Sequence, residues 1–191
     1  GVVERYSDFP SEYISARTVE VWLPDGYPGA APYDVLYMHD GQMLFDTAFT
    51  WNRQEWCVDE VTGRLIAEGA IAPAIVVGVW NSGSGRHADY FPQKPFLSLP
   101  QHVRDSLYGL RRDAETPLFD GPLRSDAYLR FLVRELKPFI DSVYRTNAGR
   151  ESTVVAGSSM GGLISLYAIC EYPEVFGGAA CLSTHWPGIF A

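Results

Sequence analysis

Apolar residues form short runs along this chain that favour strands, and longer stretches with helical spacing separate them. The first run alternates apolar and polar positions and ends at a Pro-Asp-Gly sequence, which is typical of a half-buried strand followed by a turn. Later runs are apolar at nearly every position, as expected for internal strands of a parallel sheet. The predicted strands cover residues 18–23, 34–39, 74–80, 152–156 and 178–183.

Helical spacing appears between these runs. Residues 52–68 repeat apolar positions every three or four residues, and Gly69 is a typical C-terminal stop. A second helix is expected from Ser125 or Asp126, either of which can cap its first turn, with an interruption at Pro138. A third helix follows the last glycine-rich turn. This alternation predicts an α/β fold with a mostly parallel sheet, right-handed crossovers and helices on both faces.

Residues 81–125 interrupt the pattern with frequent glycines and prolines and no regular period. A segment of this length inside a compact domain usually serves function. We interpret it as a loop excursion near the cleft that holds a short helix around residues 102–111. The chain is then predicted to be a single domain over residues 1–191.

The composition excludes some kinds of binding partner but gives little information about the reaction. The net charge of −8 and the pI of 4.9 argue against a nucleic-acid partner. No apolar run is long enough to span a bilayer. Gly1 in place of methionine fits a processed or artificial start, so the localisation stays open between the cytoplasm and a periplasmic or secreted location. Three unevenly spaced cysteines indicate neither a disulfide framework nor a zinc site, and Cys170 and Cys181 are expected to be buried.

The sequence Gly-Ser-Ser-Met-Gly at residues 157–161 matches the pattern G-x-S-x-G, with Ser159 at its centre. It follows a predicted buried strand and opens a predicted buried helix, which is the context required of a nucleophilic serine. Small residues at Gly157 and Gly161 would let strand and helix approach closely. The helix N-terminus would direct positive partial charge toward a developing oxyanion. A structural turn and a phosphate-binding turn are the alternatives, although the lysine of a P-loop is missing.

A tetrahedral intermediate of acyl transfer needs two preorganised hydrogen-bond donors. One would be the backbone N–H of Met160, the residue after the candidate nucleophile. The other comes from the loop after an earlier strand, and residues 39–46 are the natural candidate because they follow a predicted buried strand.

Four sequence strings together resemble the putative-esterase family of the α/β-hydrolase fold. This family includes feruloyl and acetyl-xylan esterases, S-formylglutathione hydrolase, enterochelin esterase and mycolyl transferases. The resemblance covers most of the chain and implies an α/β-hydrolase fold, Ser159 as nucleophile, and backbone donors at Gln42 and Met160. The strings are WLPDGY (22–27), VLYMHDGQMLFD (35–46), RHADYFP (86–92) and VVAGSSMGGLISLYAICEYPEVFGGAACLS (154–183).

The same resemblance assigns expectations to four further residues. Arg86 and Tyr90 match a patch beside the substrate cleft, with anchoring of a loop as the alternative role. His39 and Asp40 are expected to be structural, because the family uses the backbone rather than the side chains at this position.

The catalytic acid and histidine follow the serine in this fold. The resemblance places them on loops after the last two strands, whereas this chain stops one strand past the serine helix. We therefore expect a partial chain that lacks its last strands. His185 and Trp186 are interpreted as walls of the cleft, with a relocated general base as the alternative for His185.

These features predict a carboxylic-ester hydrolase in which Ser159 forms an acyl-enzyme that water then releases. We expect no metal and no organic cofactor. The expected partner is a small-molecule or acylated-carbohydrate ester, and the sequence indicates neither its identity nor the oligomeric state. One alternative is an acyltransferase that uses a sugar or an alcohol as acceptor. Another is a non-catalytic binding protein of the same fold, which the missing late histidine motivates.

Overall fold

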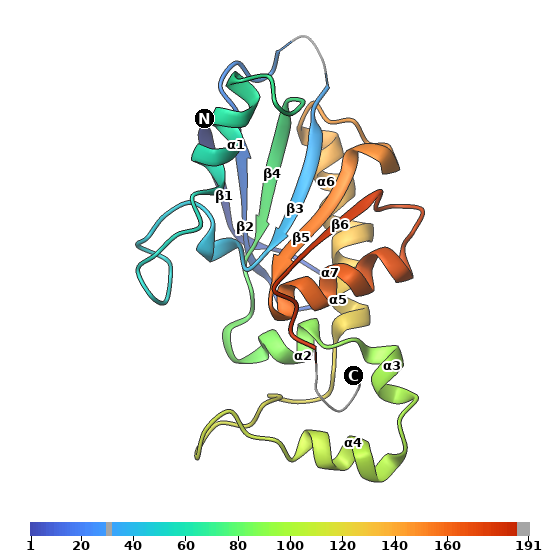
Figure 1. The fold of residues 1–191 in the computed structure, drawn as a ribbon. Coiled ribbons are helices and arrows are strands. Elements are labelled where there is room, and N and C mark those ends of the chain that lie inside the picture. The colour runs from blue at the N-terminus through green and yellow to red at the C-terminus, as the bar shows by residue number, and fades with distance from the viewer. Residues whose placement is uncertain (30–31, 187–191) are drawn as a thin grey trace.

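The computed structural model describes residues 1–29 and 32–186, which form one six-stranded sheet in the order β1-β2-β4-β3-β5-β6 (Figure 1). β4, β3, β5 and β6 run parallel, whereas β2 pairs antiparallel with both β1 and β4. The predicted α/β fold with a mostly parallel sheet is confirmed. The strands are β1 (Val2–Phe9), β2 (Arg17–Leu23), β3 (Asp34–His39), β4 (Ala74–Val79), β5 (Thr153–Ser158) and β6 (Gly178–Leu182).

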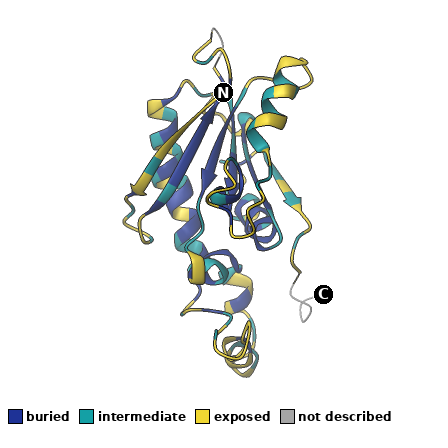
Figure 2. Cartoon of the chain, turned by 90° about the vertical axis from the view of Figure 1, so that its left-hand side faces the viewer, coloured by how far each residue is buried: buried dark blue, intermediate teal, exposed yellow. Residues whose placement is uncertain are grey.

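Helices cover both faces of this sheet because the inner strands are apolar on both sides. Val35 and Tyr37 of β3 contribute to the larger buried cluster, whereas Met38 contributes to the smaller one on the other face. Figure 2 shows the inner strands in dark blue between helices whose outer sides are exposed. Each fully buried aliphatic side chain contributes about 1.5–3 kcal/mol relative to exposure, so the inner strands are held firmly. The smaller cluster packs under α1 (Val58–Ala67), and the larger one under α5 (Ser125–Phe131), α6 (Lys137–Val143) and α7 (Met160–Glu171).

Two elements differ from the sequence-based prediction. β1 was not predicted, because it is an edge strand whose side chains are mostly exposed and show no apolar alternation. The helix expected over residues 52–68 begins only at Val58. The stretch before it is tied instead to the loop after β3, since the Trp56 N–H donates to the Met43 carbonyl at 2.8 Å.

The helix expected after residue 124 is interrupted as predicted. A π-helical turn (Leu132–Leu136) separates α5 from α6, just before Pro138, whose ring removes a backbone donor and crowds the preceding turn. The predicted cap is wrong, because no side chain caps α5. The Ser125 hydroxyl accepts a hydrogen bond from the Gln93 N–H at 2.9 Å instead, which joins α5 to the segment before it.

The segment at residues 81–125 lies beyond the carboxyl ends of the parallel strands (Figure 1). It contains a 3-10 turn (Gly83–Gly85) and the short helices α2 (Arg86–Tyr90), α3 (Gln93–Leu97) and α4 (Gln101–Tyr108). α4 is the short helix expected around residues 102–111. Edge-to-face aromatic pairs with ring centroids 5.0 to 5.9 Å apart hold the segment together, and they join Phe91, Phe96, Tyr108 and Phe119.

The cysteines are more accessible than expected. Cys170 is exposed and Cys181 is half-buried. Cys170 lies in the last turn of α7, and Cys181 lies on β6, the edge strand, so neither reaches the core. Among the described residues, no helix is both long enough and apolar enough to cross a membrane.

Candidate active site

Ser159 occupies the sharp turn between β5 and α7. Its backbone has φ 58° and ψ −117°, a left-handed conformation that costs a non-glycine residue about 1–3 kcal/mol. The surrounding structure holds it there, since the Ser159 N–H donates to the Leu182 carbonyl at 2.9 Å. The residue is half-buried, so core atoms do not cover it. This is the backbone geometry that the sequence motif requires.

The glycine before this serine permits the turn. A Cβ atom on Gly157 would lie 2.6 Å from the backbone carbon and oxygen of Gly161, closer than any real contact. The end of β5 and the first turn of α7 therefore approach each other at a distance that only glycine allows. The motif requires small residues beside the serine because of this close contact.

The loop after β3 lies at the same sheet edge, because β3 and β5 are neighbouring parallel strands with Met38 opposite Ala156. Asp40 adopts a left-handed conformation with φ 61°, and a 3-10 turn (Gly41–Met43) follows it. Gly41 packs directly on β4, where an added Cβ atom would lie 2.6 Å from the carbonyl carbon of Gly78. The turn that contains Gln42 is therefore pressed against the sheet.

The Asp40 carboxylate fixes this loop through three hydrogen bonds. Arg86 donates through Nε at 2.7 Å and through its terminal nitrogen at 2.6 Å, and Asn81 Nδ2 donates at 2.7 Å. The carboxylate is almost fully buried, so these partners replace its water shell. Asn81 also holds the Gln42 side chain, because its backbone N–H donates to Gln42 Oε1 at 3.2 Å. The structural role expected for the Asp40 side chain is consistent with these contacts.

His39 lies beneath the loop in a buried aromatic cluster. Its Nδ1 atom lies 2.7 Å from the Tyr128 hydroxyl, and its ring centroid lies 5.3 Å from that of Tyr90. Burial lowers the pKa of His39 to about 4, although the nearby charge of Asp40 opposes this shift. His39 is therefore neutral at pH 7 and is enclosed by the core, which suits the structural role expected from the sequence.

Arg86 and Tyr90 anchor the loop after β3 in this structure. Tyr90 is fully buried and its hydroxyl accepts a hydrogen bond from the Asp40 N–H at 3.3 Å. The Arg86 guanidinium lies 5.3 Å from the centre of the Tyr90 ring while it pairs with Asp40. These contacts are those of the anchoring alternative, and contact of either residue with a substrate stays a prediction.

Two backbone donors are available beside the serine. Among the described residues, neither the Gln42 N–H nor the Met160 N–H has a hydrogen-bond acceptor. Met160 is the first residue of α7, where helix geometry leaves the N–H groups unpaired. The first turn of α7 also meets the Asp40 loop, since a Cβ atom on Gly161 would lie 3.3 Å from Asp40 Oδ2. The donors thus come from two elements in contact at one sheet edge.

His185 and Trp186 follow β6 at the same edge. The His185 N–H donates to the Ser159 carbonyl at 3.1 Å, which brings the segment after β6 against the serine turn. Both side chains are exposed. His185 borders a cavity that Met160 also lines, whereas Trp186 borders a second cavity between α3 and α7. Their expected place in a cleft wall agrees with this geometry, while any catalytic role stays a prediction.

The structure adds cavity residues that the sequence did not single out. His87 lies in the RHADYFP string and His102 lies in the first turn of α4, and both border the cavity beside Met160. Leu107 and Leu118 line the same cavity from either side of a loop. The sequence could have pointed to His87 through its place in the RHADYFP string. His102 and Leu118 lie 15 and 31 positions later in the chain, and no sequence period connects them with His87.

One group of side chains in the described part of the chain has metal-ligand chemistry. Glu55, Cys57 and Glu60 place one ligand atom each within 4.8 Å of one another. Cys57 and Glu60 are exposed, and such acidic groups are common on protein surfaces. Glu55 and Cys57 precede α1, and Glu60 lies in its first turn, so none of the three belongs to the serine turn.

The sheet order, the four parallel strands and the strained serine turn define an α/β-hydrolase-type fold. The chain superimposes on an IroE-like serine hydrolase from Shewanella oneidensis with a TM-score of 0.71 and 24% identity, over 99% of this chain and 54% of that one. The chain belongs to the Putative esterase family, whose model matches residues 11–108 and 110–187. The resemblance and the fold predicted from the sequence are both confirmed.

Two curated relatives show how much of a longer protein this chain resembles. The protein YbbA of Bacillus subtilis (strain 168) is 33% identical over 172 residues, which are 89% of this chain and 58% of YbbA. An endo-1,4-β-xylanase/feruloyl esterase of Xylanibacter ruminicola is 28% identical over 178 residues, which are 87% of this chain and 19% of that protein. The chain therefore spans less than two thirds of each of these relatives.

Proposed function

We propose that the protein containing this chain hydrolyses carboxylic esters with Ser159 as its nucleophile. The observation that carries the proposal is the strained backbone of Ser159, held between a buried strand and the N-terminus of a buried helix. Such strain persists only where the surrounding packing enforces it, and it is common at catalytic positions. Membership of an esterase family supports the same reaction.

The proposed reaction has two stages. Ser159 Oγ attacks the ester carbonyl, and the oxyanion that forms accepts hydrogen bonds from the Gln42 and Met160 N–H groups. Collapse of this intermediate expels the alcohol and leaves an acyl group on Ser159, which water then removes as a carboxylic acid. The positive end of α7 adds to the stabilisation of the oxyanion.

The general base is proposed to be a histidine that follows the serine in the chain, as is typical of this fold. His39 precedes the serine, is buried and interacts with Tyr128, so it is not assigned this role. His185 is the one histidine after Ser159 in the sequence. We expect it to form part of the cleft, with the base supplied by a part of the protein that follows residue 191, so the His185→Ala variant should keep most of the activity.

A fluorophosphonate probe tests the nucleophile directly. In the full-length gene product, the probe should label Ser159, and the Ser159→Ala variant should lose both labelling and about 10⁴-fold or more in kcat for p-nitrophenyl acetate. Ser158→Ala is the matched control, because it removes the neighbouring hydroxyl from the same turn. Labelling of another residue, or full activity in the Ser159→Ala variant, would contradict the proposal.

A further inference from the structure

Asp89 is a buried carboxylate on α2 that has no part in the reaction proposed above. Its side chain is 1% exposed, and it accepts hydrogen bonds from three separate parts of the chain. Ser82 Oγ donates to Oδ2 at 2.6 Å, and Arg124 Nε donates to Oδ1 at 3.0 Å. Arg17, the first residue of β2, donates to Oδ2 through both terminal nitrogen atoms at 3.4 Å. One side chain on α2 therefore joins the sheet to the residues that follow β4 and precede α5.

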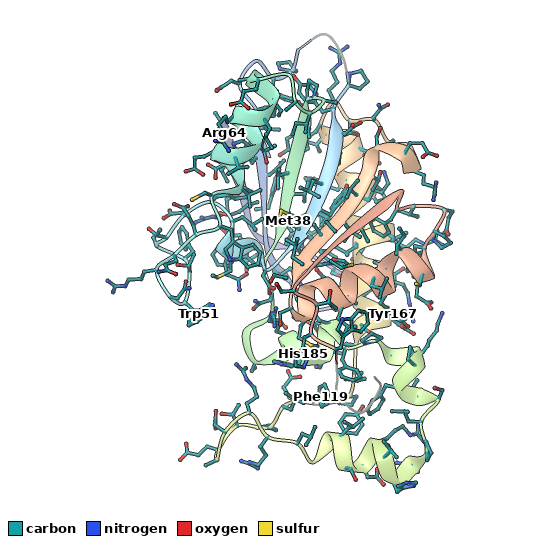
Figure 3. The ribbon with its side chains drawn as sticks, in the orientation of Figure 1. Met38, Trp51, Arg64, Phe119, Tyr167 and His185 are labelled. Carbon is teal, nitrogen blue, oxygen red and sulfur yellow. The ribbon has the colours of Figure 1, made fainter. Side chains whose placement is uncertain are left out.

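The same contacts close the segment at residues 81–125 at its base. Ser82 lies where the chain leaves β4, and Arg124 lies where the chain enters α5. Figure 3 shows this segment beyond the strand ends, with Phe119 labelled. The segment therefore extends from a base that Asp89 holds together.

The groups at this base are closely packed. A Cβ atom on Gly85 would lie 2.5 Å from a terminal nitrogen of Arg124 and 2.6 Å from Ser82 Oγ. The same nitrogen donates to the Asp120 carboxylate at 3.1 Å. The Arg124 backbone N–H donates to the Ala88 carbonyl at 2.8 Å. α2 and the end of the segment therefore hold one another in place.

The negative charge of Asp89 compensates a buried positive charge on Arg17. The Arg17 side chain is 4% exposed, and Asp89 is its acidic partner in the described part of the chain. Aromatic rings flank the guanidinium, whose central carbon lies 5.2 Å from the ring centre of Tyr128 and 5.7 Å from that of Phe131. A neutral side chain at position 89 would leave this positive charge buried without a compensating charge.

α2 connects Asp89 with the loop after β3. The helix is five residues long and no side chain caps it, so tertiary contacts rather than its own hydrogen bonds must fix its position. Arg86 lies three residues before Asp89 and donates to both carboxylate oxygens of Asp40. Tyr90, the next residue after Asp89, accepts a hydrogen bond from the Asp40 N–H. A shift of α2 would move both of these partners away from Asp40.

We propose that Asp89 is a positioning residue that fixes α2 to the sheet and thereby places Arg86 against Asp40. The Gln42 turn, which follows Asp40, then keeps its backbone N–H where the proposed oxyanion needs it. The effect on catalysis rests on the ester hydrolysis proposed above, whereas the effect on the loop after β3 can be measured without a substrate.

The Asp89→Asn variant of the full-length protein tests the catalytic effect. Its kcat for p-nitrophenyl acetate should fall about tenfold, while KM stays within about twofold, because an oxyanion donor acts mainly in the transition state. Urea unfolding checks that the variant is folded under the assay conditions. Asp113→Asn is the matched control, because it removes an exposed carboxylate from the same segment, and it should change neither value. An unchanged kcat in folded Asp89→Asn would overturn the inference.

A double-mutant cycle tests whether Asp89 acts through Arg86. In an Arg86→Lys background, which keeps the positive charge but loses the two-bonded contact with Asp40, Asp89→Asn should lower kcat less than about threefold further. If Asp89→Asn does not fold, Ser82→Ala replaces it, because it removes one hydrogen bond and keeps every charge. Ser82→Ala should lower kcat about threefold in the wild type and leave it unchanged in the Arg86→Lys background. With either variant, an undiminished loss in the Arg86→Lys background, or no loss in the wild type, would overturn the inference.

Amide hydrogen exchange tests the link to the loop without a substrate. The Met43 and Leu44 N–H groups donate hydrogen bonds within the turn that follows β3, at 2.9 and 3.2 Å. In Asp89→Asn or Ser82→Ala, these two amides should exchange at least about fivefold faster, while the amides of α1 keep their wild-type rates. Unchanged exchange at Met43 and Leu44, or equal acceleration in α1, would overturn the positioning role. If the wild-type protein hydrolyses no ester, the proposed function fails, and this measurement still decides on Asp89.

Discussion

The loop after β3 contacts the first turn of α7, and the segment around α4 shares a cavity with Met160 of the same turn, but different forces hold the two regions. Asp40 in the loop is fixed by three directional hydrogen bonds from Arg86 and Asn81, inside a buried site. The segment around α4 is held by edge-to-face packing, for example between Phe91 and Phe119. Directional bonds fix one geometry, whereas apolar packing tolerates changes of shape and size.

If the proposed function holds, this difference predicts that the two regions respond differently to substitution. A change in the loop leaves a buried polar group without its partner and should therefore affect folding and every substrate alike. A change around α4 alters the shape of a partly exposed cavity and should affect substrates unequally. A Leu110→Trp variant tests the segment around α4, because Leu110 is exposed in the wall of the cavity beside Met160, and it should affect acetate and benzoate esters unequally. Variants of Arg86, His39 and Gly157 test the loop after β3 and the serine turn beside it.

Of the variants of Arg86, His39 and Gly157, the largest effect is expected when Arg86 is replaced. Arg86→Met leaves the Asp40 carboxylate buried without its main partner, which should lower the free energy of unfolding by about 3–5 kcal/mol. Because the Gln42 turn loses its anchor, kcat should also fall about 100-fold for acetate and benzoate esters alike. Urea unfolding and steady-state kinetics measure the two effects. Arg64→Ala, on the exposed side of α1, is the control and should change neither.

A selective loss of benzoate activity in Arg86→Met, with stability retained, would contradict this picture. It would mean that Arg86 contacts the substrate rather than the loop. The cleft role considered from the sequence would then be the correct one.

An intermediate effect is expected from pH. The unfolded chain protonates His39 near its ordinary pKa of 6.5, whereas the folded chain does so only at about 4. The folded state therefore loses stability as the pH falls from about 6.5 to 4, by about 3 kcal/mol from this group. In His39→Gln, the free energy of unfolding should depend less steeply on pH across this window.

Urea unfolding at several pH values between 4 and 7 measures that slope. His102→Gln is the control, because it removes an exposed imidazole from α4 in place of the buried one. Identical slopes in the wild type and in His39→Gln would show that His39 protonates without opposition from the fold.

The smallest effect is expected at the serine turn itself. Gly157→Ala places a methyl group 2.6 Å from the Gly161 backbone, so the end of β5 and α7 must move apart. We expect a loss of about 1–3 kcal/mol in the free energy of unfolding and a lower kcat for every ester. Gly149→Ala is the matched control, since nothing lies within 4 Å of the added methyl group, and it should be neutral. Thermal unfolding of the two variants makes the comparison, and equal melting temperatures would rule out the close approach.

Much of the fold could be predicted because the signals are local. The strand predicted over residues 34–39 matches β3, and the interruption at Pro138 follows from the missing N–H of proline. β1 was missed because an exposed edge strand needs no apolar alternation. The burial of Cys170 was predicted wrongly, because the last turn of α7 extends past the core that the rest of the helix covers.

The candidate site, too, could be predicted from the sequence only where its features are local. Ser159 and Gln42 were identified from sequence strings, because each depends on a turn formed by consecutive residues. The pairing of Asp40 with Arg86 joins residues 46 positions apart, and no sequence period indicates it. The cavity that His87 and His185 share is still less local, since it forms only when the segment after α4 folds back over the strand ends.

The sequence by itself determined the alternation of the inner strands with the helices between them, the sharp turn at Ser159 and the membership of an esterase family. These properties depend on neighbouring residues, whose backbone preferences and apolar spacing act over a few positions. Only the tertiary structure decided which polar groups meet at the sheet edge and what shape of cavity lies beside the serine. Those features depend on contacts between distant segments, and the distance and direction of each contact are set by packing rather than by any local pattern.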